Sequence, residues 1–168
     1  MADIPSPVPA PGRGVSAPPV SRAIYGMPMF ATLLVADIGA TASWYTDGLG
    51  FIQLFAMPGP DGPRLVHLRR WQFQDLLVRP AARPVSAAAG TPGCTLSFAA
   101  VEGELDELAA RARNHGAGRV SGPTDTTWNT RDLTITDPDG NVIIFTAARP
   151  PDRADPQFLE LLRRSSGD

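Results

Sequence analysis

Cysteine is almost absent from this chain of 168 residues, and a long hydrophobic run is missing altogether. The single cysteine, Cys94, has no second thiol with which to form a disulfide within the chain. No apolar stretch approaches the ~20 residues that span a membrane. The first residues also lack the basic start and the apolar stretch of a signal peptide. These absences predict a cytoplasmic protein that does not enter a membrane.

The chain also has no excess of basic residues. The chain has 15 Lys and Arg against 17 Asp and Glu, which gives a formal net charge of −2 at pH 7. Because no stripe of Lys and Arg stands out, the chain has no electrostatic footprint for nucleic acid or for an anionic membrane. The sequence therefore predicts a small molecule or another protein as the partner, and no nucleic acid.

Hydrophobic residues are plentiful, at 43% of the chain, and suffice for one core. Residues 25–150 are predicted to form the folded domain. Residues 1–24 are rich in Pro, which removes amide donors, so we expect a disordered or loosely docked arm there. Residues 151–168 are a predicted tail, in which 155–164 has the apolar spacing of a helix.

The predicted domain contains the same order of elements twice. Each half has a strand, a helix and three more strands, which predicts an α+β fold of two tandem βαβββ modules, at 27–82 and 93–148. A stretch rich in Ala and Pro, 81–93, joins them. The predicted elements are the strand 29–38, the helix 39–49 and the strands 51–57, 64–70 and 74–79, then the strand 94–101, the helix 104–114, the strand 119–121 and the hairpin 128–145.

The last hairpin has the clearest turn signal in the sequence, Asp137-Pro138-Asp139-Gly140-Asn141. Proline fixes one φ angle, the Asp and Asn side chains can bond to nearby backbone, and Gly140 can adopt a positive φ. Apolar residues alternate with Thr before this turn, and four apolar residues follow it. The pattern therefore predicts two antiparallel strands around a tight turn.

Three motifs resemble the vicinal oxygen chelate superfamily. They are Val35-Ala36-Asp37, then Trp44-Tyr45 followed by Gly48-Leu49-Gly50-Phe51, and Trp128-x-x-Arg131 followed by the Asp-Pro-Asp-Gly-Asn turn. This superfamily holds glyoxalase I, extradiol dioxygenases, fosfomycin-resistance enzymes and bleomycin-binding proteins. The resemblance covers residues 27–148 and implies paired modules whose curled sheets enclose a cavity. At Asn129 this chain departs from the glycine that the family usually has.

The resemblance also implies where metal ligands would lie, because the enzymes of the family place His and Glu on the inner faces of their strands. Those positions fall here on Phe30, on Leu76, on Cys94 or Leu96, and on Ile144. At least three of the four are apolar, and such walls cannot offset the desolvation of a divalent cation. We therefore expect no metal ligand and no cofactor.

The remaining candidates for chemistry are few. His67 is predicted in the third strand, where it could be a polar contact to a ligand, a general base or an ordinary sheet residue. His115 is expected in the turn after the second helix, solvated or capping that helix. Cys94 is expected to be a small buried hydrophobic residue rather than a ligand or nucleophile.

Apolar and aromatic side chains dominate the predicted inner faces, which suits a flat or bulky organic ligand, although the same residues could simply fill the core. Trp44, on the first helix, is expected to pack behind the sheet. Arg131 is either part of the site or paired with Asp132 or Asp139. The predicted ligand-binding residues are Phe30, Leu34, Phe55, His67, Trp71, Leu76, Leu96, Phe98, Trp128, Arg131 and Ile144, and no catalytic residue is predicted.

Together these features predict a metal-independent protein similar to the bleomycin-resistance branch, which sequesters an antibiotic or an aromatic metabolite in a homodimer. One alternative is an enzyme, either a glyoxalase- or dioxygenase-like lyase or oxidoreductase with a divalent metal, or a metal-free lyase or isomerase. Another is a regulatory or scaffolding subunit. The sequence leaves open whether the modules pair within one chain or swap between two.

Overall fold

Two four-stranded mixed sheets form the body of the protein, each with the strand order that a βαβββ module requires. The computed structural model describes residues 10–11, 14–82, 94–116 and 118–165. The first sheet has the order β1-β4-β3-β2 and the second β5-β8-β7-β6, with only the first pair of each sheet parallel. The strands are β1 (Ala31–Val35), β2 (Ile52–Met57), β3 (Leu65–Arg69), β4 (Asp75–Pro80), β5 (Thr95–Ala99), β6 (Arg119–Asp125), β7 (Thr130–Thr136) and β8 (Val142–Ala148).

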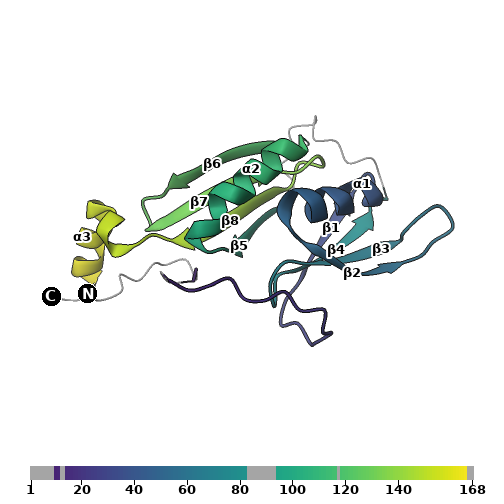
Figure 1. The fold of residues 1–168 in the computed structure, drawn as a ribbon, viewed down its shortest axis with the longest axis horizontal. Helices are drawn as coiled ribbons and strands as arrows, with labels where there is room; N and C mark the ends of the chain where they lie inside the picture. The colour runs from purple at the N-terminus through teal and green to yellow at the C-terminus, as the bar shows by residue number, and fades with distance from the viewer. Residues whose placement is uncertain (1–9, 12–13, 83–93, 117, 166–168) are drawn as a thin grey trace.

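The helices of the two modules pack on the sheets and on each other. Figure 1 shows α1 in front of the first sheet and α2 in front of the second, with α3 at the far end of the molecule. Asp37 caps α1, because its Oδ1 accepts a hydrogen bond from the Ala40 amide at 2.9 Å. Gly116, with φ of 77°, ends α2 in the left-handed conformation. The helices are α1 (Ile38–Ser43), the π-helical turn η1 (Trp44–Gly48), the short η3 (Glu102–Glu104), α2 (Leu105–His115), the short η4 (Pro151–Arg153) and α3 (Pro156–Ser165).

The fold class predicted from the sequence is confirmed, with two modules of the expected element order. The largest difference is β6, which runs through Asp125 rather than ending at Ser121. The strand continues through Gly122-Pro123, although proline cannot donate to a strand ladder. Here β6 is an edge strand, and its register shifts between Ser121 and Thr124, so both residues are accommodated at an irregularity.

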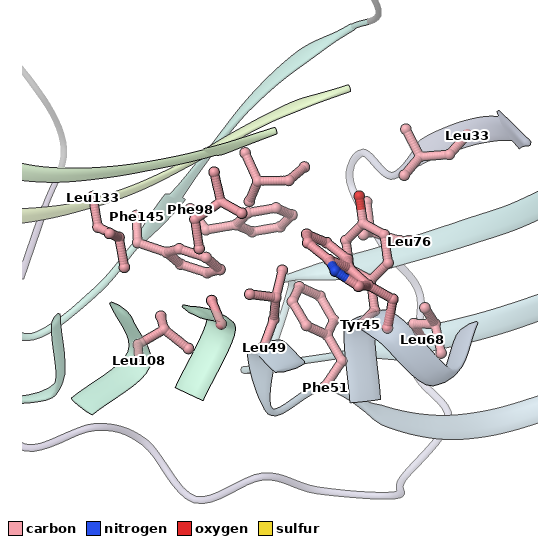
Figure 2. Packing of buried hydrophobic residues seen from close by; sticks show 14 of the residues in the cluster. Leu33, Tyr45, Leu49, Phe51, Leu68, Leu76, Phe98, Leu108, Leu133 and Phe145 are labelled. Atoms are coloured by element: carbon pink, nitrogen blue, oxygen red, sulfur yellow. The ribbon is translucent and has the colours of Figure 1, made fainter. Parts of the chain in front are cut away.

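One hydrophobic core joins the two modules (Figure 2). Phe51 of the first module meets Phe98 of the second edge-to-face, with ring centroids 5.6 Å apart. Phe98 in turn stacks on Phe145 at 5.9 Å. Tyr45 of η1 packs against Phe51, and Trp44 is buried beside it, as expected for a residue behind the sheet. Aromatic pairs of this geometry contribute about 0.5–1.5 kcal/mol each beyond the area they bury.

The Asp137–Asn141 turn also connects the modules. Asp139 accepts two hydrogen bonds from the first module, from the Ala36 amide at 2.8 Å and from Thr41 Oγ1 at 2.9 Å. Asp137 accepts one from the Tyr45 hydroxyl at 3.0 Å and two from Asn141 within the turn. Burial raises the pKa of the Asp137 carboxyl above its ordinary value. The motif that marks the family in the sequence therefore holds the two halves together.

Candidate ligand-binding face

The first sheet has one side without a helix, which we call the open face. Leu33, Leu68 and Leu76 point to the helices and are buried, so by the two-residue period of a strand their neighbours point the other way. Four large apolar side chains there are between 39% and 53% exposed, two at each edge of the sheet. They are Phe30, directly before β1, Leu34 of β1, and Phe55 and Met57 of β2.

Strand register places a histidine in the middle of this face. Phe55 pairs with His67, His67 with Leu77, and Leu77 with Thr32, so the four side chains form one row across the sheet. The imidazole Nε2 of His67 lies 2.7 Å from Asp75 Oδ2. The central row therefore combines the apolar Phe55 and Leu77 with an imidazole that Asp75 orients, and further along the sheet the exposed Arg79 pairs with Leu34.

Asp75 is the centre of a buried charge cluster at one end of the open face. Arg69 binds it with two hydrogen bonds, from Nε to Oδ1 at 2.8 Å and from Nη2 to Oδ2 at 2.7 Å. Both side chains are 1% exposed. Such a bidentate pair satisfies most of the hydrogen bonds that a buried ion pair needs. The bond to Asp75 raises the pKa of the Arg69 guanidinium.

The N-terminal arm covers this end of the open face. The guanidinium of Arg69 donates to the carbonyl oxygens of Ser21 at 2.9 Å and Ala23 at 2.7 Å, and it lies 4.1 Å from the Tyr25 ring centroid. The Tyr25 hydroxyl accepts a hydrogen bond from the Phe73 amide at 3.0 Å. Figure 1 shows this purple segment running past both modules before it enters β1. In the described residues the arm is thus docked, which the sequence left open.

Four of the predicted ligand-binding residues meet on the open face: Phe30, Leu34, Phe55 and His67. Three others lie on the opposite, core-facing side of their strands, which is the alternative that the sequence left open for them. Leu76 and Phe98 lie in the core under the helices, and Leu96 packs against the same cluster half-buried. A shift of one residue in register moves a side chain to the opposite face of a sheet, so the two sides of a strand separate a core residue such as Leu76 from the open face.

Ile144 lies on the helix-free side of the second sheet, and that side has a different character. Its neighbours across the ladder are Ser97 of β5 and Thr134 of β7. Further along, Thr146 Oγ1 donates to Asp132 Oδ1 at 2.7 Å. The second sheet thus offers hydroxyl groups where the first offers aromatic and aliphatic surface.

The two tryptophans predicted at cavity mouths are separated from the open face. Trp71 is buried, and the Cζ atom of Arg70 lies over its ring, 4.4 Å from the ring centroid. It lines a cavity of about 280 Å³ between the modules and the arm residues Ala17 and Pro18. Trp128 is 45% exposed in the turn between β6 and β7.

Arg131 is paired with neither of the partners considered from the sequence. Its Nη2 lies 3.3 Å from Asp106 Oδ1 on α2, because α2 crosses the end of β7. Asn129 adopts a φ of 65°, so this asparagine reproduces the left-handed turn that a glycine would make. This part of the family motif therefore shapes the end of the second sheet.

Two further predictions concern residues with reactive side chains. His115 is exposed at the last position of α2, close to the predicted turn. Cys94 is exposed rather than buried, because it stands one residue before β5, where its amide donates to Asn141 Oδ1 at 3.2 Å. Partial burial nevertheless raises the pKa of its thiol, which disfavours the reactive thiolate.

The side chains present do not fit the metal centre found in enzymes of this fold. Among the described residues, no three His, Cys, Asp or Glu side chains come together in a group that could hold a metal ion. The carboxylate nearest the open face, Asp75, is already committed to Arg69 and His67.

The chain belongs to the Glyoxalase/Bleomycin resistance protein/Dioxygenase superfamily, whose family model matches residues 28–145. No curated protein sequence is significantly similar to it. In the described residues, no helix has the length and apolar character needed to cross a membrane.

Solved structures of the same fold include proteins linked to antibiotics. The bleomycin resistance determinant encoded on the transposon Tn5 shares 19% identity and a TM-score of 0.57, over 74% of this chain and 100% of that one. TioX from Micromonospora sp. ML1 shares 22% identity and a TM-score of 0.56, over 73% and 99%. TnmS3, an antibiotic-binding protein from Streptomyces sp. CB03234, shares 24% identity and a TM-score of 0.52, over 75% and 98%.

Proposed function

We propose that this protein binds an apolar, aromatic small molecule on the open face of its first sheet and sequesters it without using a metal. The observation that carries the proposal is a pair of exposed apolar side chains at each edge of this face, Phe30 with Leu34 and Phe55 with Met57, on either side of His67 and Leu77. Exposed apolar patches of this kind mark interaction sites. An aromatic antibiotic or metabolite would cover them by stacking and burial.

Family membership supports the same conclusion. The family contains bleomycin resistance proteins, and one protein of the same fold is described as antibiotic-binding. The donor set supports metal independence, since the polar groups of the open face include Thr32, His67, the ion-paired Arg69 and Asp75, and a second cation, Arg79. Binding, rather than metal-assisted chemistry, is what these groups perform well.

We further propose that two copies of the chain form a dimer in which the open face of one copy lies opposite the helix-free side of the second sheet of the other. The ligand would then lie between the subunits. A single chain leaves the open face without a second wall. The helix-free side of the second sheet, with its hydroxyl groups from Ser97 and Thr134, would supply polar contacts opposite the apolar ones. A ligand held between the two would be enclosed on both sides.

The first test is isothermal titration calorimetry with a panel of aromatic antibiotics and aromatic metabolites, together with thermal melts. A bound compound should raise the melting temperature with its concentration. Phe55→Ala should weaken binding about tenfold, because it removes half-exposed aromatic surface worth about 1–2 kcal/mol, and should leave the melting temperature nearly unchanged.

Phe98→Ala is the matched control, since it removes the same side chain from the core. It should lower the free energy of unfolding by about 3–5 kcal/mol. If Phe55→Ala bound every compound as tightly as the natural chain does, the open face would not be the binding site.

A metal-free lyase or isomerase is the second candidate, and the His67–Asp75 contact of 2.7 Å favours it. An imidazole held by a carboxylate is an arrangement that serves general acid–base catalysis. Mass spectrometry of a bound compound after prolonged incubation distinguishes the two functions. A product that forms with the natural chain and not with His67→Phe would establish the enzyme.

A further inference from the structure

The position of His67 is unusual for a surface that works only by apolar contact. Its ring lies in the central row of the open face, between Phe55 on one side and Leu77 on the other. The side chain is 20% exposed, so it packs among its neighbours and yet remains accessible. Any flat molecule covering Phe55 and Leu77 would therefore contact the imidazole.

The hydrogen bonds around Asp75 decide which nitrogen of His67 carries the proton. Asp75 forms a buried ion pair with Arg69, and an ionised carboxylate only accepts hydrogen bonds. His67 must therefore donate from Nε2 to Asp75 Oδ2. In the neutral imidazole the other nitrogen, Nδ1, is then a hydrogen-bond acceptor. Within the described residues, Nδ1 has no donor bonded to it.

Arg69 also binds the Asp75 carboxylate and holds it in place. Its remaining N–H groups bond to the arm carbonyls of Ser21 and Ala23, and the Tyr25 ring covers it. Neither member of the ion pair can turn away without breaking several bonds. Asp75 is therefore a positioning residue that acts on a ligand through His67.

We propose that His67 selects the ligand, with Nδ1 accepting a hydrogen bond from a hydroxyl or N–H group on the edge of an apolar ring system. This inference rests on the proposed function and narrows its ligand class to aromatic hydrogen-bond donors such as phenols. A ring of the same size whose hydroxyl is methylated keeps the apolar contact and loses the donor. The methylated compound should bind more weakly, because Nδ1 is then covered by the ring without a hydrogen-bond donor.

The test compares 2-naphthol with 2-methoxynaphthalene by isothermal titration calorimetry on the full chain. The natural chain should bind 2-naphthol about three- to tenfold more tightly, as one neutral hydrogen bond allows. His67→Phe, which keeps a planar ring in the row, should bind both compounds with similar affinity. Equal affinities in the natural chain would overturn the inference and leave the proposed function standing. Binding of neither compound would overturn both.

Nitrogen-15 NMR of the imidazole rings provides a second readout that needs no ligand. The chain has only two histidines, so the signals missing in His67→Phe identify His67, and exposed His115 is the internal reference. We expect the neutral ring to carry its proton on Nε2 and to leave Nδ1 bare. In Asp75→Asn this preference should weaken, because the ionised acceptor is gone. A neutral ring that carries its proton on Nδ1 in the natural chain would overturn the inference.

Discussion

Asp137 shows how one residue links the family motif to the stability of this chain. Its carboxyl is buried at the contact between the modules and bonds to Tyr45 and Asn141. Burial disfavours the charged form, and this effect outweighs the hydrogen bonds that favour it, so the pKa of Asp137 is raised. Burial and the nearby Asp137 also raise the pKa of Tyr45, which keeps that phenol neutral.

The raised pKa of Asp137 predicts a pH dependence of stability. A folded pKa above the ordinary 3.8 means that Asp137 contributes most at low pH, and that this contribution is lost as pH rises through the folded pKa. Asp137→Asn does not titrate. In urea unfolding at pH 4, 5, 6 and 7, the natural chain should therefore lose stability relative to Asp137→Asn as the pH increases. A difference that stays constant over this range would contradict the prediction.

Single residues also show where sequence reasoning stops. Leu76 and Phe98 were recognised as apolar strand residues, and that much was right. In Leu76-Leu77-Val78 apolar residues stand at adjacent positions, so the alternation that reports burial is weak. Thr95-Leu96-Ser97-Phe98 does alternate, but the pattern does not tell whether its apolar side faces the helices or a ligand. Phe55 lies on the exposed side of β2, and its role in ligand binding stays a prediction.

Among the elements, the arm departs furthest from what its composition suggests. Repeated prolines exclude it from helices and sheets, and the described part indeed has neither. Its attachment comes instead from backbone carbonyls that accept hydrogen bonds from Arg69. Composition cannot reveal such contacts, because any residue supplies a carbonyl oxygen. The sequence did indicate one part of this attachment, because the hairpin of β3 and β4 places Arg69 opposite Asp75. It did not indicate the bonds from Arg69 to the arm.

Tyr25 is the side chain that tests whether the arm is held by the sheet. Tyr25→Ala removes the ring contact with Arg69 and the hydrogen bond from the Phe73 amide, which together predict a loss of about 1–2 kcal/mol in unfolding free energy. Limited trypsin digestion should also cleave after Arg22 faster. Tyr25→Phe keeps the ring and should show a smaller effect in both assays. An unchanged cleavage rate in Tyr25→Ala would mean that the ring does not hold the arm.

At the scale of the whole molecule, the two helix-free sheet sides differ in a way that fits the proposed dimer. One is mainly apolar and the other carries Ser97, Thr134 and Thr146. Sequence reasoning predicted the paired modules, because element order and turn residues are local properties. It could not predict the contrast between the two sides, which depends on the register of every strand.

Sedimentation at micromolar concentration tests the dimer directly, and we expect twice the mass of one chain. Leu34→Glu puts a charge on the open face and should shift the protein to single chains. Leu161→Glu, a comparable change at an exposed position on α3, should leave the dimer intact. A natural chain that sediments as a monomer would remove the dimer, and a dimeric Leu34→Glu would place its contact elsewhere.

The Asp137–Asn141 turn has a further consequence for how the chain can be divided. Its two aspartates receive hydrogen bonds from Ala36, Thr41 and Tyr45, all in the first module. A second module expressed alone would expose Phe98 and Phe145 and would have no donors for Asp139. The modules therefore repeat one architecture without being autonomous folding units. Exchange of one module between related proteins would succeed only if the donors to this turn moved with it.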